Sequence, residues 1–400
     1  MGLKLWLGML ASLIGVSLLL FALVVGPWLL TRHPQHGLTS EEELKAKNDV
    51  RTTLVQTLAG LAVAGGLLVT YRTFQHNRVE QDRSYRLRQA EQVNEFSAKA
   101  FEQLGHEKAP VRLGALYSLV NIAQNNPHQR QTVVDVICSY LRMPYPFAES
   151  AEPITQEGAQ ELQVRLTAQR LLAEHLRVPA GVAVRDAQQL EVSPELSFWP
   201  GMKIHLAGAD LFDFSLKRSS VVGGNFSNAT FRGDVEFNFT AFDGYVDFSE
   251  ATFAGGAFFG GAMFRGEAAF PLAMFRRQAL FRRAHFSRKT SFAVASFSVG
   301  AIFSECEFRN AIYFDEAKFY GLTSFASATF AANVYFGGTS FSGGLSFALA
   351  TVLQPHKFRD ENGYPIVRVW PEGWALETVQ SEAMQCGLVR VDEPPLPDGG

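Results

Sequence analysis

Phenylalanine recurs along the C-terminal half of the chain with a spacing that neither a helix nor an ordinary strand produces. From Phe226 to Phe347, 23 phenylalanines follow one another at steps that alternate between five and six residues. Four aliphatic residues lead into this run at even steps of five: Leu206, Leu211, Leu216 and Val221. A helix repeats every ~3.6 residues and a strand every two. The spacing therefore predicts a chain that turns by about 90° at each step.

Four such steps make one coil of 20 to 22 residues, and successive coils stack at the strand spacing of ~4.8 Å. Phenylalanines 22 residues apart then lie above one another inside the coil, and a small or β-branched residue two places earlier leaves room for each ring. We expect just under seven coils. Glycine is often the second residue after phenylalanine in the six-residue steps, where we expect it to adopt unusual φ values: Gly233, Gly244, Gly255, Gly266, Gly321 and Gly343.

Short motifs within this run resemble the pentapeptide-repeat family, whose motif is A-(D/N)-L-x-x. Ala209-Asp210-Leu211 matches that motif, and a phenylalanine-centred form recurs as Ala-Thr-Phe at Phe231, Phe253 and Phe330. The resemblance implies a right-handed quadrilateral β-helix over residues 201–350. Together with the apolar N-terminus, the chain looks like the membrane-anchored pentapeptide proteins of actinobacteria. That likeness is one of architecture, and it implies no shared activity.

Two uncharged segments near the N-terminus predict transmembrane helices. Leu5–Thr31 exceeds the ~30 Å of a hydrocarbon core, and Thr52–Tyr71 is 20 residues long. A cleaved signal peptide is the rival interpretation of the first segment, but its apolar run is too long. Ala62 and Gly66 in the second segment allow close helix contact and an oligomer, or simply reflect the usual composition of membrane helices.

Arginine after the second segment sets the predicted orientation. Five arginines lie within 20 residues of its end: Arg72, Arg78, Arg83, Arg86 and Arg88. The positive-inside rule places them in the cytoplasm. Two spans then predict a multi-pass protein of the cell membrane with both termini cytoplasmic and a short external loop over residues 32–51. Three well-separated cysteines predict free thiols in a reducing compartment.

The remaining pattern divides the chain into four regions. Residues 1–77 hold the two predicted membrane helices with the short external loop. Residues 78–200 predict a cytosolic α-helical region, which packs either on itself or on the end of the repeat. Residues 201–350 form the predicted β-helix, and residues 351–400 a cap followed by a loose tail. The fold class is therefore mixed, with transmembrane helices, a helical linker domain and a β-helix.

No catalytic, cofactor or metal motif occurs in the sequence, so we expect no enzyme activity and no cofactor. One cluster of basic residues follows three consecutive repeat centres: Arg276, Arg277, Arg282, Arg283, Arg288 and Lys289. This basic band is a candidate site for an anionic partner, and a solvated surface is its ordinary alternative. Acidic residues on the next coil, among them Glu305 and Glu307, are placed to pair with it.

These observations favour a non-enzymatic, membrane-anchored scaffold whose partners are the lipid bilayer and an unknown protein. A membrane-bound ligand sensor or an enzyme with an unrecognised site is the alternative. A third hypothesis, regulation of DNA gyrase by DNA mimicry, needs a strongly negative rod. Residues 201–353 hold 13 Lys+Arg and 12 Asp+Glu, a net charge of +1. The near-neutral balance disfavours both mimicry and nucleic-acid binding.

Overall fold

The computed structural model describes residues 39–145, 155–191, 195–353, 365–377 and 385–391, together with Phe21 and Val25. It divides the chain into two compact units, residues 1–93 and 94–400. The helices are α2 (Ser40–Leu104), α3 (Ala109–Asn125), α4 (Arg130–Arg142) and α5 (Gln156–Leu176), with the short 3-10 helices η1 (Pro127–Gln129) and η2 (Val184–Gln189).

Helix α2 begins earlier than the sequence pattern indicated. Thr39 precedes it and donates both its backbone N–H and its hydroxyl to the Glu42 carboxylate, at 2.9 and 2.8 Å. Strong helix formers follow in the segment EEELKAK. Ser40–Arg51 of the predicted external loop over residues 32–51 is helical, and its location outside the membrane stays a prediction. The helix also continues without a break past residue 77.

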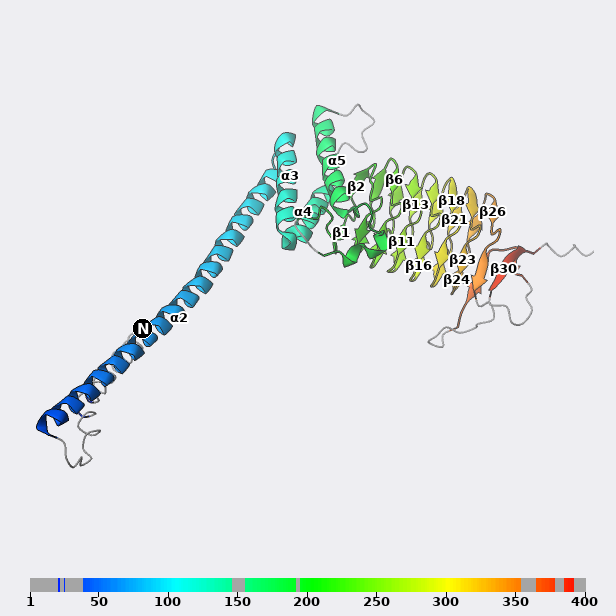
Figure 1. The fold of residues 1–400 in the computed structure, drawn as a ribbon. Coiled ribbons are helices and arrows are strands. Elements are labelled where there is room, and N and C mark those ends of the chain that lie inside the picture. Colours follow the sequence, from blue (N-terminus) through cyan, green and yellow to red (C-terminus); the bar gives the residue numbers. More distant parts are fainter. Residues whose placement is uncertain are drawn as a thin grey trace, which may run out of the picture. The chain divides into compact units, whose positions relative to one another are not determined.

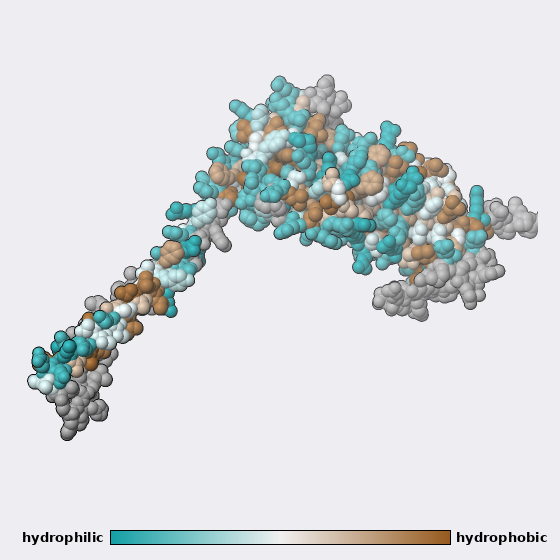
Figure 2. All heavy atoms as spheres, viewed as in Figure 1, coloured by the Kyte–Doolittle hydropathy of each residue, from teal (hydrophilic) through white to brown (hydrophobic). Residues whose placement is uncertain are grey.

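One helix in the described part of the chain is long and apolar enough, by length and composition, to cross a membrane. It is the Ser40–Tyr85 part of α2, and its most apolar stretch has no buried residue. Figure 2 shows apolar side chains along this helix. The predicted second span, Thr52–Tyr71, falls inside it. The predicted first span, Leu5–Thr31, lies outside the described residues apart from Phe21 and Val25, so the two-span arrangement stays a prediction.

Residues 203–353 form a right-handed β-solenoid of about seven coils, as the repeat predicted (Figure 1). Each coil contributes short strands to four parallel sheets, which we number in chain order. Sheet I contains β1 (Lys203–His205), β4 (Gly223–Asn225), β8 (Val246–Asp247), β12 (Ala268–Ala269), β16 (Thr290–Ser291), β20 (Ile312–Tyr313), β24 (Val334–Tyr335) and β28 (Arg368–Val369). Sheet II contains β2 (Asp210–Phe212), β5 (Thr230–Arg232), β9 (Thr252–Phe253), β13 (Met274–Phe275), β17 (Ser296–Phe297), β21 (Lys318–Phe319) and β25 (Ser340–Phe341).

The other two sheets complete the four faces. Sheet III contains β6 (Val235–Glu236), β10 (Ala257–Phe258), β14 (Ala279–Leu280), β18 (Gly300–Ile302), β22 (Leu322–Ser324) and β26 (Leu345–Ser346). Sheet IV contains β3 (Ser220–Val221), β7 (Ala241–Phe242), β11 (Met263–Phe264), β15 (His285–Phe286), β19 (Glu307–Phe308), β23 (Thr329–Phe330) and β27 (Thr351–Leu353), and continues antiparallel through β30 (Gln385–Arg390) to β29 (Trp374–Leu376).

The phenylalanines stack in four ladders inside the solenoid, as predicted. Strands of neighbouring coils pair residues 22 apart, for example Ala257 with Ala279. Rings one coil apart are nearly parallel, with the centroids of Phe253 and Phe275 4.5 Å apart at 1°. Rings of opposite ladders, such as Phe270 and Phe281, meet edge to face across the interior. Of the repeat phenylalanines only Phe341, in the last coil, is not fully buried. The interior of the solenoid is therefore filled by its own side chains.

The five-residue steps, rather than the six-residue ones, need the unusual φ values. Each five-residue step is a tight turn in which the N–H three residues after phenylalanine donates to its carbonyl, as Ala229 does to Phe226 at 3.1 Å. The third residue of the turn has positive φ in all twelve cases, from Asn228 to Leu349, and only Gly261 and Gly338 among them are glycine. This is the type II turn geometry.

Steric crowding, rather than an unusual φ, explains why glycine occurs in the six-residue steps. Of the six glycines for which we predicted an unusual φ, only Gly233 has a positive one, so the prediction is wrong for the other five. These steps form wide corners that lie directly against the backbone of the preceding coil. A Cβ added at Gly321 would sit 1.1 Å from the carbonyl oxygen of Val299, and one at Gly255 2.1 Å from that of Gly233. Close approach to the preceding coil therefore excludes a Cβ at these glycines.

Glutamine side chains cover the first strands of the solenoid. Gln131 of α4 accepts from the Lys203 N–H and donates to the Lys203 carbonyl, at 2.9 and 3.0 Å. Gln169 of α5 does the same with Phe212, at 3.0 and 2.7 Å. A primary amide carries one acceptor and two donors, so it replaces the hydrogen bonds of a missing strand. The helices α3 to α5 thus cap an edge that would otherwise stay unpaired (Figure 1).

Replacing Gln169 with glutamate is expected to lower the free energy of unfolding by ~1–3 kcal/mol. The carboxylate keeps an acceptor but loses the donor, and it sets a negative oxygen against the Phe212 carbonyl. Guanidinium unfolding of the purified full chain measures the change. Gln163→Glu is the matched control, because Gln163 lies exposed on the same helix. Equal effects of the two variants would show that the hydrogen bonds between the Gln169 amide and the Phe212 backbone contribute nothing to stability.

Two tryptophans cover the last coil. The Trp370 ring meets Phe330, Phe336 and Phe347 with centroids 5.4, 6.3 and 6.1 Å away. Trp374 packs against Phe347 at 5.0 Å. These contacts close the described C-terminal end of the phenylalanine ladders.

Candidate interaction surface

The basic band lies on three corners of one coil. Arg276 and Arg277 occupy the wide corner before β14, Arg282 and Arg283 the tight turn after it, and Arg288 and Lys289 the wide corner before β16. All six side chains are exposed, as the sequence predicted. The structure therefore brings the six residues onto one coil, but distributes them around it instead of gathering them on one face.

One carboxylate of the next coil forms ion pairs with two of the arginines. Glu305 accepts from Arg282 at 2.8 and 2.6 Å and from Arg283 at 2.6 Å. The hydrogen bonds from Arg283 and then Arg282 hold the pKa of the Glu305 carboxyl below its ordinary value. The pairing predicted between the band and the next coil is confirmed at this residue. Glu307 instead pairs with Arg309 and His285 on sheet IV.

The other members of the band stay available to solvent or to a partner. Arg276, Arg277 and Arg288 form no ion pair with any residue that the structure describes. The Lys289 ammonium lies 5.3 Å from the centroid of the Tyr313 ring, a cation–π contact. Three free guanidinium groups on one coil give this part of the solenoid a positive surface despite the near-neutral total charge.

Sequence reasoning missed an apolar strip next to these arginines. The strip contains Phe258, Leu280 and Ile302, which lie one residue before the sheet III repeat centre in three successive coils. Each of these side chains faces outward and is half-buried. Their spacing of 22 residues was visible in the sequence. The signal was hidden because the neighbouring phenylalanines dominate the apolar pattern.

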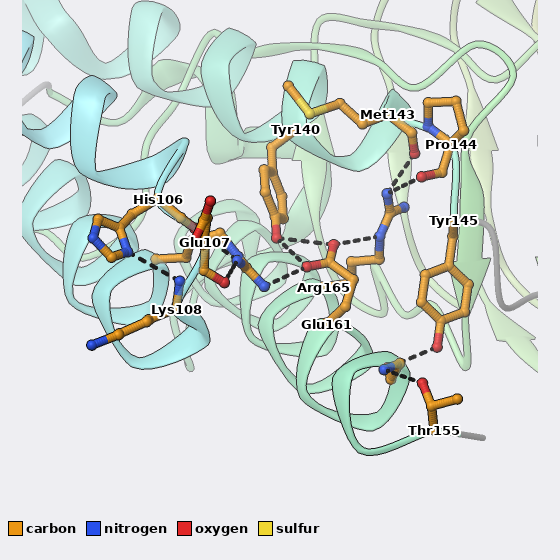
Figure 3. A network of polar contacts seen from close by, with 12 residues as sticks. His106, Glu107, Lys108, Tyr140, Met143, Pro144, Tyr145, Thr155, Glu161 and Arg165 are labelled. Atoms are coloured by element: carbon orange, nitrogen blue, oxygen red, sulfur yellow. Dashed lines mark hydrogen bonds and ion pairs between the residues drawn. The ribbon is translucent and has the colours of Figure 1, made fainter.

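A second cluster of charged groups joins the helices of the cap. The Glu161 carboxylate accepts from Arg165 at 2.9 Å, from Arg112 at 2.8 Å and from the Tyr140 hydroxyl at 2.9 Å. Figure 3 shows Arg165 pointing at the carbonyls of Met143 and Pro144 on its other side. Each charged group thus faces partners from other elements, so the cluster fastens α3, α4 and α5 to residues 143–145.

Burial determines the protonation of this cluster. It raises the pKa of the Tyr140 hydroxyl well above the ordinary value, and the adjacent Glu161 charge adds to the effect. The phenol therefore stays protonated and donates to the carboxylate at neutral pH. Because the Glu161 carboxylate joins donors from α3, α4 and its own helix α5, we assign this cluster a structural role.

No group of three or more His, Cys, Asp or Glu side chains within the described ranges is placed to hold a metal ion. The three cysteines are free thiols and are buried. Burial raises the pKa of Cys138 to about 12, so that thiol is not a nucleophile at neutral pH.

Comparison with known proteins identifies the repeat. Residues 303–351 match a family model described as pentapeptide repeats (9 copies). The matched segment is the C-terminal third of the solenoid, and the same 22-residue register extends back through the earlier coils. No curated protein and no solved structure matches the chain.

Proposed function

Because the solenoid carries pentapeptide repeats, we propose that this chain is a non-enzymatic, membrane-anchored scaffold that presents the solenoid to the cytoplasm as a protein-interaction module. The observation that carries the proposal is the filled interior. Phenylalanine rings from all four faces occupy the space inside the coils, and nearly all are fully buried. Binding by the solenoid must therefore take place on its outer faces, which are wide and regular.

The apolar part of α2 supports the anchoring. Side chains such as Leu61 and Leu67 are 64% and 67% exposed, and an exposed apolar helix of this length is stable in a bilayer. The arginines that follow it favour the cytoplasm for the solenoid. The basic band, in which Arg276, Arg277 and Arg288 form no ion pair with a described residue, supplies a surface for an anionic partner.

Introducing Leu61→Arg and Leu67→Arg together is expected to release the full-length chain from the membrane fraction. Each arginine near the centre of a span costs ~2.5–3.5 kcal/mol of insertion free energy. Sedimentation of cell membranes after a carbonate wash, followed by immunoblotting, measures the distribution.

Ser84→Arg is the control, because Ser84 lies in the charged stretch of α2 that follows its apolar part, and that variant should stay in the membrane fraction. Retention of the double variant would show that α2 is not the anchor. Protease treatment of sealed inverted vesicles tests the orientation, since a cytoplasmic solenoid would be digested there without detergent.

A further inference from the structure

The outward positions of sheet III differ from those of the other three sheets. Three successive strands, β10, β14 and β18, place Phe258, Leu280 and Ile302 outward in direct register. In the corresponding positions the other sheets carry mainly polar or small residues: Asp247, Ala269 and Ser291 on sheet I, Thr252, Met274 and Ser296 on sheet II, and Met263, His285 and Glu307 on sheet IV. Over these three coils the outer face of sheet III is therefore selectively apolar, whereas Glu236, Ser324 and Ser346 take the same position on its other strands.

More apolar side chains extend this strip beside β18 and onto the next coil. Val299 lies at the wide corner before β18, and Tyr320 and Leu322 lie at the corner and the start of β22. Their side chains are 51%, 54% and 60% exposed. Leu322 pairs with Gly300, the residue after Val299. We call these six residues, Phe258, Leu280, Val299, Ile302, Tyr320 and Leu322, the apolar strip. Such a contiguous exposed patch is typical of a protein contact.

Positive charge borders the strip on both sides of Leu280, while Glu236 lies beside Phe258 at one end of the strip. Arg276 and Arg277 stand at the corner before β14, and Arg282 and Arg283 at the turn after it, with Leu280 between the two pairs. Glu305 neutralises part of the second pair, whereas the first pair has no acidic partner among the described residues. Aromatic residues and arginine around an apolar centre are the composition of protein interfaces.

We propose that the apolar strip and its flanking arginines bind a protein segment whose apolar residues are flanked by aspartate or glutamate. The proposal rests on the interaction role of the solenoid and not on its membrane anchoring. Charge complementarity favours an acidic segment, because four arginines lie beside Leu280 and, within the described part of the chain, only the Glu305 carboxylate forms ion pairs with them. A nucleic acid backbone would match the arginines but would leave Phe258, Leu280 and Ile302 uncovered.

A bilayer surface fits less well than a protein. Phe258, Leu280 and Ile302 lie half-buried on a flat sheet, so they do not protrude as far as side chains that insert into a lipid interface. The Phe258 ring lies over the backbone of Gly256, where an added Cβ would sit 2.8 Å from it. A flat apolar face between charged edges suits a second protein surface.

Site-specific photocrosslinking in intact cells tests the proposal. A benzophenone amino acid is placed at position 280 of the full-length chain and, as a control, at position 291 on the outer face of sheet I. We expect position 280 to form an adduct with one protein species at a yield about tenfold above that of position 291. Mass spectrometry should locate the adduct in a segment that carries acidic residues around apolar ones.

A charge variant supplies the second arm. Arg277→Glu with Arg282→Glu should lower the yield at position 280 by about tenfold, since like charges would then face each other. Lys318→Glu, an exposed lysine on sheet II without an ion pair in the described part of the chain, should leave it unchanged. Thermal melts of the purified variants check folding. A synthetic peptide of the crosslinked segment should bind the wild-type chain and not the double variant.

Several outcomes would overturn the proposal. Adducts with the mass of phospholipid at position 280 would assign the strip to the membrane surface. A crosslinked segment without acidic residues, equal yields at positions 280 and 291, or no adduct at either position would each contradict it. The membrane-release experiment with the α2 variant tests the anchoring alone. The crosslinking experiment tests the surface of the solenoid, so either proposal can fail without the other.

Discussion

Replacing Phe281 with alanine is expected to lower the free energy of unfolding by ~3–5 kcal/mol. Phe281 is fully buried. Its ring stacks on Phe259 and Phe303, with centroids 4.7 and 4.9 Å away, and meets the edge of Phe270 at 5.8 Å. Truncation leaves a cavity in the middle of a ladder, because the hydrogen bonds between coils prevent the walls from collapsing. Guanidinium unfolding of the purified full chain measures the change.

The matched control is Phe341→Ala in the last coil. Phe341 is partly exposed and stacks on a single ring one coil away, Phe319 at 4.9 Å. The Phe341 ring buries less apolar area on folding than the Phe281 ring does, and the end of the solenoid can relax around the truncated side chain. We therefore expect the free energy of unfolding to fall by ~1–2 kcal/mol. If the two variants unfolded at the same denaturant concentration, the ladders would not be the main source of stability.

Replacing Gly321 with alanine is expected to destabilise the solenoid by ~3 kcal/mol or more. The new methyl group would overlap the carbonyl oxygen of Val299, which is backbone and cannot rotate away. The φ of Gly321 is not positive, so the effect is steric and not conformational. The wide corner would have to move outward and break hydrogen bonds to the preceding coil. Circular dichroism during thermal unfolding measures the loss.

Gly344→Ala is the control for this substitution. Gly344 lies in the wide corner of the next coil, and its added Cβ would meet only the end of the exposed Leu322 side chain, at 3.2 Å. That side chain can turn aside, so we expect a change within ~0.5 kcal/mol. A mild effect at Gly321 would mean that neighbouring corners can separate without loss of the fold.

The sequence was sufficient to predict the solenoid because its signal is periodic. Alternating steps of five and six fix which residues face inward, and the 22-residue sum fixes the register between coils. Leu206, Phe226 and Phe347 all lie in the predicted core. The helices α3, α4 and α5 were also predictable, because Pro110 opens the first, Pro127 precedes the second, and Pro144 and Pro146 break the chain before the third. Periodic burial produces a periodic pattern of apolar residues, and such a pattern can be recognised in the sequence without knowledge of the fold.

Features that depend on contacts between distant residues were not predictable. Nothing in the sequence marks Gln131 and Gln169 as partners for strand edges that lie 72 and 43 residues away, respectively. The candidate site was found only in part. The basic band was visible as a run of arginines. Whether Glu305 forms its ion pair with Arg276 or with Arg283 depended on how the corners of neighbouring coils stack.

The amino-acid sequence by itself determined that this chain builds a phenylalanine-filled solenoid, because the interval between buried residues is a local property. Only the tertiary structure decided why glycine occupies the wide corners, since the constraint is a carbonyl group 22 residues earlier. It also decided which arginines remain free and that Phe258, Leu280 and Ile302 align on one outer face. Those properties arise from the stacking of coils, which brings together groups that are far apart along the chain.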